Sequence, residues 1–373
     1  MVGSLYENAG AGSDWPSRFG PAERFVLCCL VGEEAAARNL LEAGIDLETV
    51  ARFALYHEVV GEVTAFSAKA ALPLPAELLS GLDVHTSRLR AQVETLTRAT
   101  LRLAGRLRHA GLDALFVKGA VAHVLYRPAG VVRTSKDLDV LVRLEDMERV
   151  LAALPADYEL FEEARGRSMK RLAARLHHLS AWAVDDEVAV EIHWDLAAPW
   201  HAFPYDLEAA LGRGVPVPIG EGEVMTLRED DAVVFWALEL SKDSWVSLKK
   251  IFDFARSVDA AGADRLRSAF ASARAAGTAR MLRIGLLVAE RLTLLSLPQV
   301  ARAFAAEDPT ASRIADACLR RLVRAGGRGG LAERVEEGLL FARKHDDLAA
   351  KLRHVWNIII VYRVKGWLGM GPH

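Results

Sequence analysis

Apolar residues recur at helical spacing in the first part of the chain. The pattern holds from residue 21 to about residue 82, with breaks at Gly44 and in the proline-containing segment 72–75. A long amphipathic helix follows, because positions three and four apart place on one face Leu89, Val93, Leu96, Thr100, Leu103 and Leu107. Gly111 ends this helix at a position that suits a left-handed cap.

The pattern then changes to short strands that alternate with helices. The elements it predicts are, in order, strand 113–118, helix 120–126, strand 137–142, helix 145–154 and strands 179–184 and 188–194. Pro128 ends the first of these helices, and Asp185 and Asp186 form the turn between the last two strands. This order predicts an α+β fold, a small mixed sheet with helices on one side.

Helical spacing returns in the last part of the chain. Before it, the Pro- and Gly-rich stretch over 212–222 predicts a loop and a short hairpin. Thr226 and Glu229 fit a capping box, with Thr226 as the N-cap of a helix. Helices then run to about residue 368, with breaks near Gly262, Gly277 and residues 324–330. We therefore divide the chain into a disordered leader over 1–20, a helical region over 21–85, an α/β core over 86–225 and a C-terminal helical region over 226–373.

Composition and charge narrow the class of protein. Of the 373 residues, 51% are hydrophobic and 26% are charged, which is typical of a folded chain, and the net charge of −2 provides no overall basic field for nucleic acid. The three cysteines form neither a CxxC pair nor a disulfide framework, as in a reduced protein. No signal peptide or 18-residue apolar run is present. We therefore expect a cytoplasmic protein without a membrane span. The nearest apolar run, 355–368, is interpreted as a docked terminal helix, with an interfacial membrane helix as the alternative.

Two aspartates on one predicted strand are the first candidate for chemistry. Asp137 and Asp139 are two residues apart, so a strand directs both side chains to one face, while Leu138 and Val140 take the other. Neighbouring carboxylates repel each other, and a divalent cation relieves the repulsion. Hard oxygen ligands favour Mg²⁺. The alternative is a solvated strand end.

The last predicted strand repeats this arrangement. Glu191 and His193 share one face, and Val188, Val190 and Ile192 the other. If the two strands are neighbours, three carboxylates converge, which suits a two-metal site for phosphoryl transfer. The alternatives are an ion pair with arginine for Glu191 and a hydrogen-bonded wall residue for His193.

A lysine and a glycine lie where the first strand meets a helix. The first turn of a helix offers free N–H groups to a phosphate, Gly119 permits close approach, and Lys118 adds positive charge. Familiar phosphate-loop, zinc-protease and serine-hydrolase motifs are absent from the sequence. The candidate site therefore consists of these lysine, glycine and carboxylate positions.

Four separated pieces of the chain carry a family resemblance. They are the strand end 115–119, the turn Tyr126-Arg127-Pro128, the segment Arg-Thr-Ser-Lys-Asp-Leu-Asp-Val-Leu-Val over 133–142, and Val-Glu-Ile-His-Trp over 190–194. In this order they resemble a bacterial nucleotidyltransferase family, many of whose members are uncharacterised, within the polymerase-β-like superfamily. The resemblance implies a polymerase-β-like core flanked by N- and C-terminal helical regions.

The resemblance also implies roles for individual residues. The catalytic metal ions, Mg²⁺ with Mn²⁺ as an alternative, would be held by Asp137, Asp139 and Glu191. The nucleotide would be contacted by Lys118, Gly119, Arg133 and Ser135. To these nucleotide-binding residues we add two lysines of the C-terminal helices, Lys242 and Lys249. Arg133 would stabilise the transferring phosphate or brace its loop. Lys249 and Lys250 could reach the triphosphate, and the alternative is that both are surface lysines without a role in binding. We assign substrate contacts to His193 and Trp194.

Several features depart from the resemblance or lie outside it. Asp243 stands where the family segment carries a histidine, and Lys118-Gly119 with a longer gap replaces the Gly-Ser of the superfamily. The basic residues of segment 165–178 form a solvated helix face or a site for a phosphate-rich acceptor. The glycine-rich segment 326–330 follows no strand, so we interpret it as a hinge or loop.

Together these observations predict a function. We expect an NTP-dependent nucleotidyltransferase, with ATP among its candidate donors, that moves an NMP to an acceptor hydroxyl and releases pyrophosphate. The acceptor is expected to be a small molecule, a natural product or a peptide. A toxin-like transferase acting on tRNA is an alternative that the charge balance and the missing aromatic platform disfavour. The other alternative is a non-catalytic nucleotide-binding or scaffold protein on the same fold.

Overall fold

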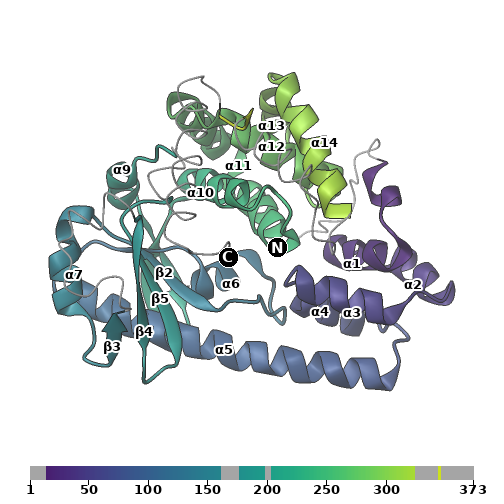
Figure 1. The fold of residues 1–373 in the computed structure, drawn as a ribbon, viewed down its shortest axis with the longest axis horizontal. Coiled ribbons are helices and arrows are strands. Elements are labelled where there is room, and N and C mark those ends of the chain that lie inside the picture. Colours follow the sequence, from purple (N-terminus) through teal and green to yellow (C-terminus); the bar gives the residue numbers. More distant parts are fainter. Residues whose placement is uncertain (1–13, 161–175, 198–202, 324–342, 346–373) are drawn as a thin grey trace, which may run out of the picture.

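One long helix joins a helical region to a small sheet, and further helices cover both (Figure 1). The computed structural model describes residues 14–160, 176–197, 203–323 and 343–345. The basic residues 165–175, the glycine-rich segment 326–330 and the apolar run 355–368 lie outside the described residues. Within the described ranges, every helix is too short or too polar to cross a membrane.

The N-terminal region is a cluster of short helices. Its elements are η1 (Trp15–Arg18), α1 (Pro21–Val31), α2 (Glu34–Glu42), α3 (Leu47–Tyr56) and α4 (Val60–Lys69). Residues 1–13 of the expected leader lie outside the described residues, whereas residues 14–20 differ from the expectation. Trp15 and Phe19 are buried there, which gives this segment apolar contacts that a disordered leader lacks.

Helix α5 (Ala76–His109) is the long helix that the apolar spacing predicts, and it begins earlier than the pattern suggested. Its buried face includes Leu89, Val93, Leu96 and Leu103 as expected. Gly111 adopts the left-handed conformation that the cap requires. Because α5 packs against α4 and also beneath the sheet, one element spans the expected boundary near residue 85.

The main sheet is mixed, as predicted. Its five strands are β1 (Leu115–Phe116), β2 (Asp137–Leu141), β3 (Tyr158–Leu160), β4 (His178–Ala183) and β5 (Val188–His193), in the order β1-β2-β5-β4-β3. Strands β2 and β5 pair in parallel, and the other pairs are antiparallel. β1 is shorter than predicted, and β3 was not predicted, since three residues at a sheet edge show too little alternation. Helices α6 (Gly119–Tyr126) and α7 (Met147–Ala153), the latter preceded by η2 (Leu144–Asp146), follow β1 and β2.

A hairpin and a second group of helices complete the chain. Strands β6 (Val215–Ile219) and β7 (Gly222–Thr226) form the expected hairpin, after the unpredicted α9 (Leu207–Gly212). The predicted capping box is wrong: Thr226 belongs to β7, and the N-cap of the next helix is Arg228, whose side chain makes no cap bond. Strand pairing takes Thr226 out of reach of the helix.

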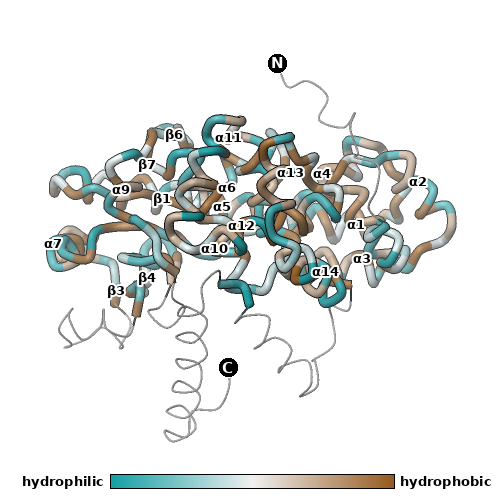
Figure 2. Tube along the Cα trace, turned by 90° about the horizontal axis from the view of Figure 1, so that it is seen from above, coloured by the Kyte–Doolittle hydropathy of each residue, from teal (hydrophilic) through white to brown (hydrophobic). Residues whose placement is uncertain are grey.

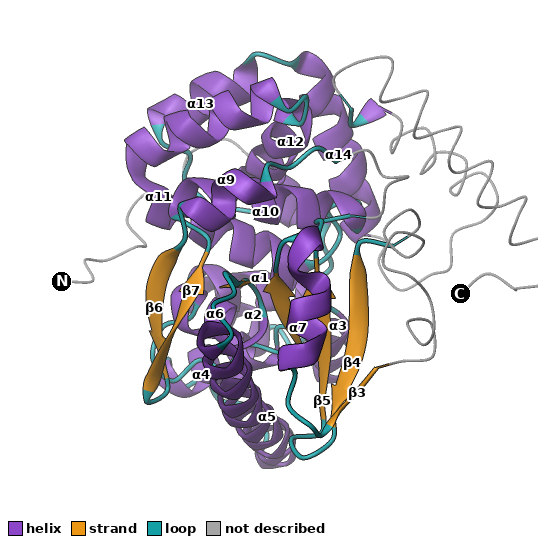
Figure 3. Ribbon diagram, turned by 90° about the vertical axis from the view of Figure 1, so that its left-hand side faces the viewer, coloured by secondary structure: helices purple, strands orange, loops and turns teal. Residues whose placement is uncertain are grey.

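The C-terminal helices are α10 (Glu229–Lys242), α11 (Leu248–Ala275), α12 (Ala279–Arg291), α13 (Gln299–Ala306) and α14 (Pro309–Val323). Two of the predicted breaks are confirmed, because Gly262 kinks α11 and Gly277 precedes α12, both with positive φ, whereas the third, at residues 324–330, lies outside the described residues. The view in Figure 3 has these helices above both sheets. Seen from above, α10 and α12 lie between the sheet and helices α1–α3 (Figure 2), and α10 is accordingly buried on nearly every side. The predicted α+β fold with flanking helices is confirmed.

Candidate active site

The predicted carboxylates meet on adjacent strands. β2 and β5 pair in parallel with Asp139 directly opposite Glu191, while Leu138 and Val190 on the other face are buried in the core. Asp137 shares the face of Asp139 because strand side chains alternate. Ligand atoms of Asp139, Glu191 and His193 all lie within 4.8 Å of one another. The expectation that the two acidic strands are neighbours is therefore confirmed.

The environments of these carboxylates differ. Burial raises the pKa of Asp137, and the charge of Asp139 raises it further. Burial also disfavours the charged form of Asp139, but Lys118 and His193 outweigh it and hold the pKa of Asp139 below its ordinary value. The Oδ2 atom of Asp139 is buried and has no hydrogen-bond partner among the described residues. This arrangement leaves an anionic oxygen available to a cation.

Lys118 connects the start of α6 to the acidic strand. Its Nζ donates to Asp139 Oδ1 at 2.8 Å and lies 3.2 Å from Glu239 Oε2. Burial by itself would lower the pKa of Lys118, but these two carboxylates outweigh it and raise the pKa. A Cβ at Gly119, where φ is +51°, would lie 2.9 Å from the backbone oxygen of Asp137. Glycine is therefore required for α6 to begin this close to β2.

Glu239 is a site residue that the sequence analysis missed. It lies on α10 with only 4% of its side chain exposed, and it forms ion pairs with Lys118, Lys242 and Lys250. Burial opposes its ionisation, but these three lysines hold the pKa of Glu239 well below its ordinary value. One signal could have identified Glu239: it is the only carboxylate in the apolar run 232–240, and a carboxylate in such a run is rarely buried without a partner.

The N-terminal region also contributes to the site. Glu58, between α3 and α4, lies 2.5 Å from Lys249 Nζ and 3.1 Å from Lys136 Nζ. Burial lowers the pKa of Lys249, and the nearby Arg133 lowers it further, while Glu58 opposes the shift. Glu58 was also missed, because no short-range pattern links it to residues so far along the chain.

Arg133 and Ser135 are buried beside this cluster. The Arg133 guanidinium donates through Nη2 to Asp253 Oδ2 at 2.8 Å and through Nη1 to Ser135 Oγ at 2.6 Å. Ser135 Oγ in turn donates to the backbone oxygen of Gly119 at 3.4 Å. Arg127 also donates to Asp253, at 2.7 Å, so that one carboxylate on α11 holds two arginines of the α6–β2 segment. This geometry suits the role of Arg133 in bracing the loop.

Asp243, which departs from the family pattern, has a partner in the structure. Its Oδ2 lies 2.5 Å from Lys250 Nζ, at the start of α11. The aspartate therefore positions one of the lysines that surround Glu239. The substitution leaves the three carboxylates on β2 and β5 in place.

Histidines form the remaining wall of the site. His193 Nε2 lies 3.2 Å from Asp139 Oδ1 and 3.0 Å from Glu191 Oε2, so the predicted substrate residue contacts the carboxylates directly. His177 and His178, predicted only as part of a basic segment, meet edge to face, and the ring of His178 lies 4.9 Å from that of His193. Burial, together with the neighbouring histidines, lowers the pKa of His177 to about 2. Trp194, the other predicted substrate residue, packs in the core with 8% of its surface exposed.

The donors present fit a divalent cation. Asp137, Asp139 and Glu191 offer carboxylate oxygens on one face, and one oxygen of Asp139 lacks any partner among the described residues. Such donors suit Mg²⁺ or Mn²⁺, and the His193 nitrogen adds a ligand that Mn²⁺ accepts more readily. The lysines around Glu239 lie beside these donors, since Lys118 contacts both Asp139 and Glu239. A candidate metal site and a cluster of lysines are thus adjacent.

Comparison with known proteins agrees with this geometry. The model of an uncharacterised nucleotidyltransferase family matches residues 43–293, more than half of the chain, and includes every residue of the cluster just described. Among curated proteins, none matches the chain. The match confirms the resemblance found in the sequence: the chain belongs to the uncharacterised nucleotidyltransferase family.

Proposed function

We propose that this protein transfers an NMP from an NTP to an acceptor hydroxyl in a reaction that depends on Mg²⁺, with Mn²⁺ as an alternative. Membership of the family supports nucleotidyl transfer in general. The observation that carries the finer proposal is the pairing of Asp139 with Glu191 on parallel strands, with one Asp139 oxygen lacking a partner among the described residues. Since NTPs are made inside the cell, we propose that the reaction takes place in the cytoplasm.

The carboxylates and the lysines have different proposed roles: the carboxylates hold the metal, and the lysines bind phosphate. Asp137, Asp139 and Glu191 would hold the metal, which when bound neutralises triphosphate charge and makes the acceptor hydroxyl easier to deprotonate. Glu191 or Asp139 accepts the hydroxyl proton. Lys118 extends from the start of α6, where the free N–H groups of the first turn favour a phosphate.

Further cations come from the C-terminal helices. Lys242 and Lys250 share Glu239 with Lys118, and Lys249 is held by Glu58. We propose that these ammonium groups bind the triphosphate and stabilise the departing pyrophosphate. Arg133 and Ser135 act by fixing the segment that leads into β2, since both are bonded to protein partners.

The acceptor is proposed to be a small molecule, a natural product or a peptide rather than tRNA. The net charge of −2 provides no overall basic field, and such a field would favour binding of a polyanion. The cations at the site are instead gathered around two carboxylates, the buried Glu239 and the half-buried Glu58, which is a cluster small enough for one triphosphate.

Transfer of label from α-labelled NTPs into a cell extract tests this proposal. We expect Mg²⁺-dependent labelling by the wild type, none by Asp137→Ala/Asp139→Ala, and wild-type labelling by the control Asp264→Asn, whose side chain is 97% exposed. Nuclease and protease sensitivity of the product then identifies the acceptor class. Labelling that survives the double substitution would contradict the assigned carboxylates.

A binding measurement distinguishes a transferase that lacks its acceptor from a different kind of protein. We expect NTP with Mg²⁺ to raise the melting temperature of the wild type but not of the double variant. If neither ligand shifts the melting temperature of the wild type, the proposal of an NTP site fails.

A further inference from the structure

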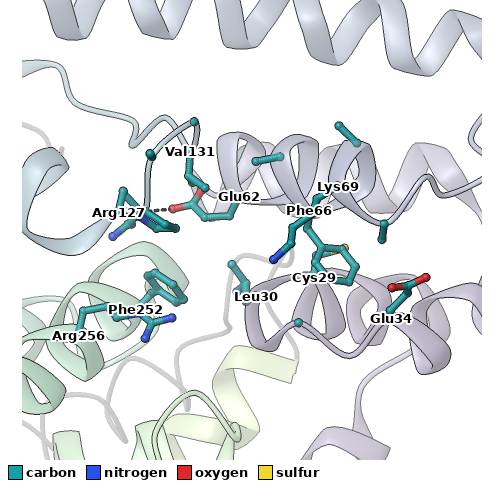
Figure 4. Close-up of a pocket in the computed structure, with 17 residues that line it drawn as sticks. Cys29, Leu30, Glu34, Glu62, Phe66, Lys69, Arg127, Val131, Phe252 and Arg256 are labelled. Atoms are coloured by element: carbon teal, nitrogen blue, oxygen red, sulfur yellow. Dashed lines mark hydrogen bonds and ion pairs between the residues drawn. The ribbon is translucent and has the colours of Figure 1, made fainter. Parts of the chain in front are cut away.

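Three histidines gather beside the carboxylates of β2 and β5. One ring nitrogen from each lies within 4.8 Å of those of the other two, and the three residues are His177, His178 and His193. The cavity in Figure 4 differs, because its buried Arg127 donates to Glu62 at 2.6 Å and the two charges compensate each other. Uncharged imidazoles are common metal ligands. These three residues, the histidine cluster, are therefore a candidate metal site with a different ligand chemistry from the carboxylates.

The backbone holds the three rings in place. His178 and His193 are register partners on the antiparallel strands β4 and β5, which puts their side chains on one face of the sheet. His177 precedes β4, and its backbone oxygen accepts from the backbone N–H groups of Trp194 at 3.0 Å and Asp195 at 3.3 Å. Consecutive strand residues point to opposite faces, yet the rings of His177 and His178 lie 4.4 Å apart. The start of β4 thus departs from alternation and adds a third imidazole to the cross-strand pair.

The spacing of the ring nitrogens suits a transition-metal ion. His178 Nδ1 and His177 Nε2 are 3.2 Å apart. Two nitrogens bound to one Zn²⁺ lie about 3.3 Å apart in a tetrahedral site with Zn–N bonds of about 2.0–2.1 Å. The ring of His193 lies 4.9 Å from that of His178 and 5.5 Å from that of His177. Small rotations of the rings therefore bring all three nitrogens to one ion.

The charges around the histidine cluster favour a cation. Glu191 Oε1 lies 4.0 Å from His178 Nε2, so a small shift lets this carboxylate accept the Nε2 proton while Nδ1 binds a metal. Lys242 is the nearby cation, and it is paired with Glu239. The side chains of His178 and Glu191 are 26% and 31% exposed, so an ion can reach them from solvent. The negative charge of Glu191 also repels phosphate from the imidazoles.

We propose that the histidine cluster binds a Zn²⁺ ion through its three imidazoles, with Glu191 orienting His178. Mg²⁺ prefers oxygen ligands, whereas imidazole nitrogen suits Zn²⁺, so this ion is distinct from the one proposed for the carboxylates. Three protein ligands leave the fourth position of a tetrahedral ion open to water. Zinc binding does not rest on the proposed transfer reaction, and it is measured without nucleotide.

Calorimetric titration of the metal-free full chain with Zn²⁺, in the presence of excess Mg²⁺, tests the proposal. We expect one tightly bound Zn²⁺ per chain that Mg²⁺ does not displace. His178→Ala should weaken Zn²⁺ binding at least about 100-fold, because even the partners behind metal ligands change affinity by about 10–100-fold. The control His109→Ala, at the exposed end of α5, should bind Zn²⁺ like the wild type. Wild-type affinity of His178→Ala, or no binding by the wild type, overturns the proposal.

Two further measurements separate this site from the carboxylates. His178→Ala is expected to keep wild-type Mn²⁺ affinity, measured by electron paramagnetic resonance, and loss of both metals together would mean one shared site and overturn the proposal. If His178→Ala does not fold, X-ray absorption spectroscopy of the wild type loaded with one Zn²⁺ decides the matter. Three imidazole ligands support the histidine cluster, and fewer than three overturn it.

Discussion

Asp139 and Glu191 are register partners on the parallel strands β2 and β5, and His193 contacts both of them. The parallel pairing places two carboxylates side by side although they belong to distant segments. Lys118 and His193 compensate part of the negative charge on Asp139. The strands alone therefore determine the spacing of the acidic cluster, while side chains from other elements determine its charge.

Removing the charge of Asp139 is expected to abolish transfer with little change in shape. Asp139→Asn keeps the side-chain volume but loses an anionic ligand, and we expect kcat to fall about 10³-fold, since each 1.36 kcal/mol of lost charge stabilisation costs about tenfold. Mn²⁺ affinity, measured by electron paramagnetic resonance, should fall in parallel. Asp264→Asn is the control, and an Asp139→Asn enzyme with wild-type kcat would exclude the metal role.

Substitution of Gly119 is expected to disturb the site through the backbone. Gly119→Ala forces a side chain into positive φ and against the Asp137 carbonyl, so we expect a loss of about 1–3 kcal/mol in the free energy of unfolding and a lower kcat/KM. Gly105→Ala, in the interior of α5 with open space around it, should instead stabilise by about 0.5–1 kcal/mol. Urea unfolding measures the free energy of unfolding of both variants. Equal values for Gly119→Ala and Gly105→Ala would show that α6 can move away from β2 without loss of stability.

Asp253 is expected to contribute strongly to stability. Asp253→Asn leaves two buried arginines without their shared carboxylate, and breaking a buried pair in this way costs about 3–5 kcal/mol. Chemical unfolding of Asp253→Asn beside Asp264→Asn tests this, since the second variant breaks an exposed pair. Similar stability of the two variants would mean that the arginines find other partners.

His57 is expected to make the fold sensitive to acid. Burial lowers its pKa from 6.5 to about 4, so between these values the unfolded chain binds a proton that the folded chain does not. The free energy of unfolding should therefore decrease as the pH falls from 6.5 to 4, by up to about 3 kcal/mol. His57→Phe removes this titration and retains ring contacts with Phe53 and Tyr56. Urea midpoints of the two proteins should diverge below pH 6.5, and parallel midpoints would show that His57 keeps an ordinary pKa.

The sequence was most informative where one strand determines which residues share a face. Alternation on β2 and β5 identifies the carboxylates and the buried face beneath them, because both properties repeat every second residue. The position of Gly119 was also predictable from its neighbours in sequence, because it lies at the turn between a strand and a helix. Strand β3 could not be predicted, because it forms only by pairing at the edge of the sheet. The start of α10 could not be predicted either, because it depends on where the preceding hairpin ends.

The pattern of residues along the sequence could not predict contacts between elements that lie far apart in the chain. Glu239 reaches the lysines from α10 and Glu58 from the turn between α3 and α4, and only the packing of these distant elements brings them together. Arg133 was recognised, but its pairing with Asp253 was not predicted, so its role remained divided between phosphate contact and bracing. Trp194 was assigned to the substrate because of its motif, whereas burial places it in the core.

The position of Asp253 has a consequence for the protein as it is synthesised. The ribosome completes β2 and β5, with all three carboxylates, before it makes α11. Until then, Arg127 and Arg133 lack the carboxylate that they share, and the segment between α6 and β2 is held by contacts with earlier residues, such as the ion pair of Arg127 with Glu62. A nascent chain can therefore carry the complete acidic cluster before Arg133 has the partner that fixes it.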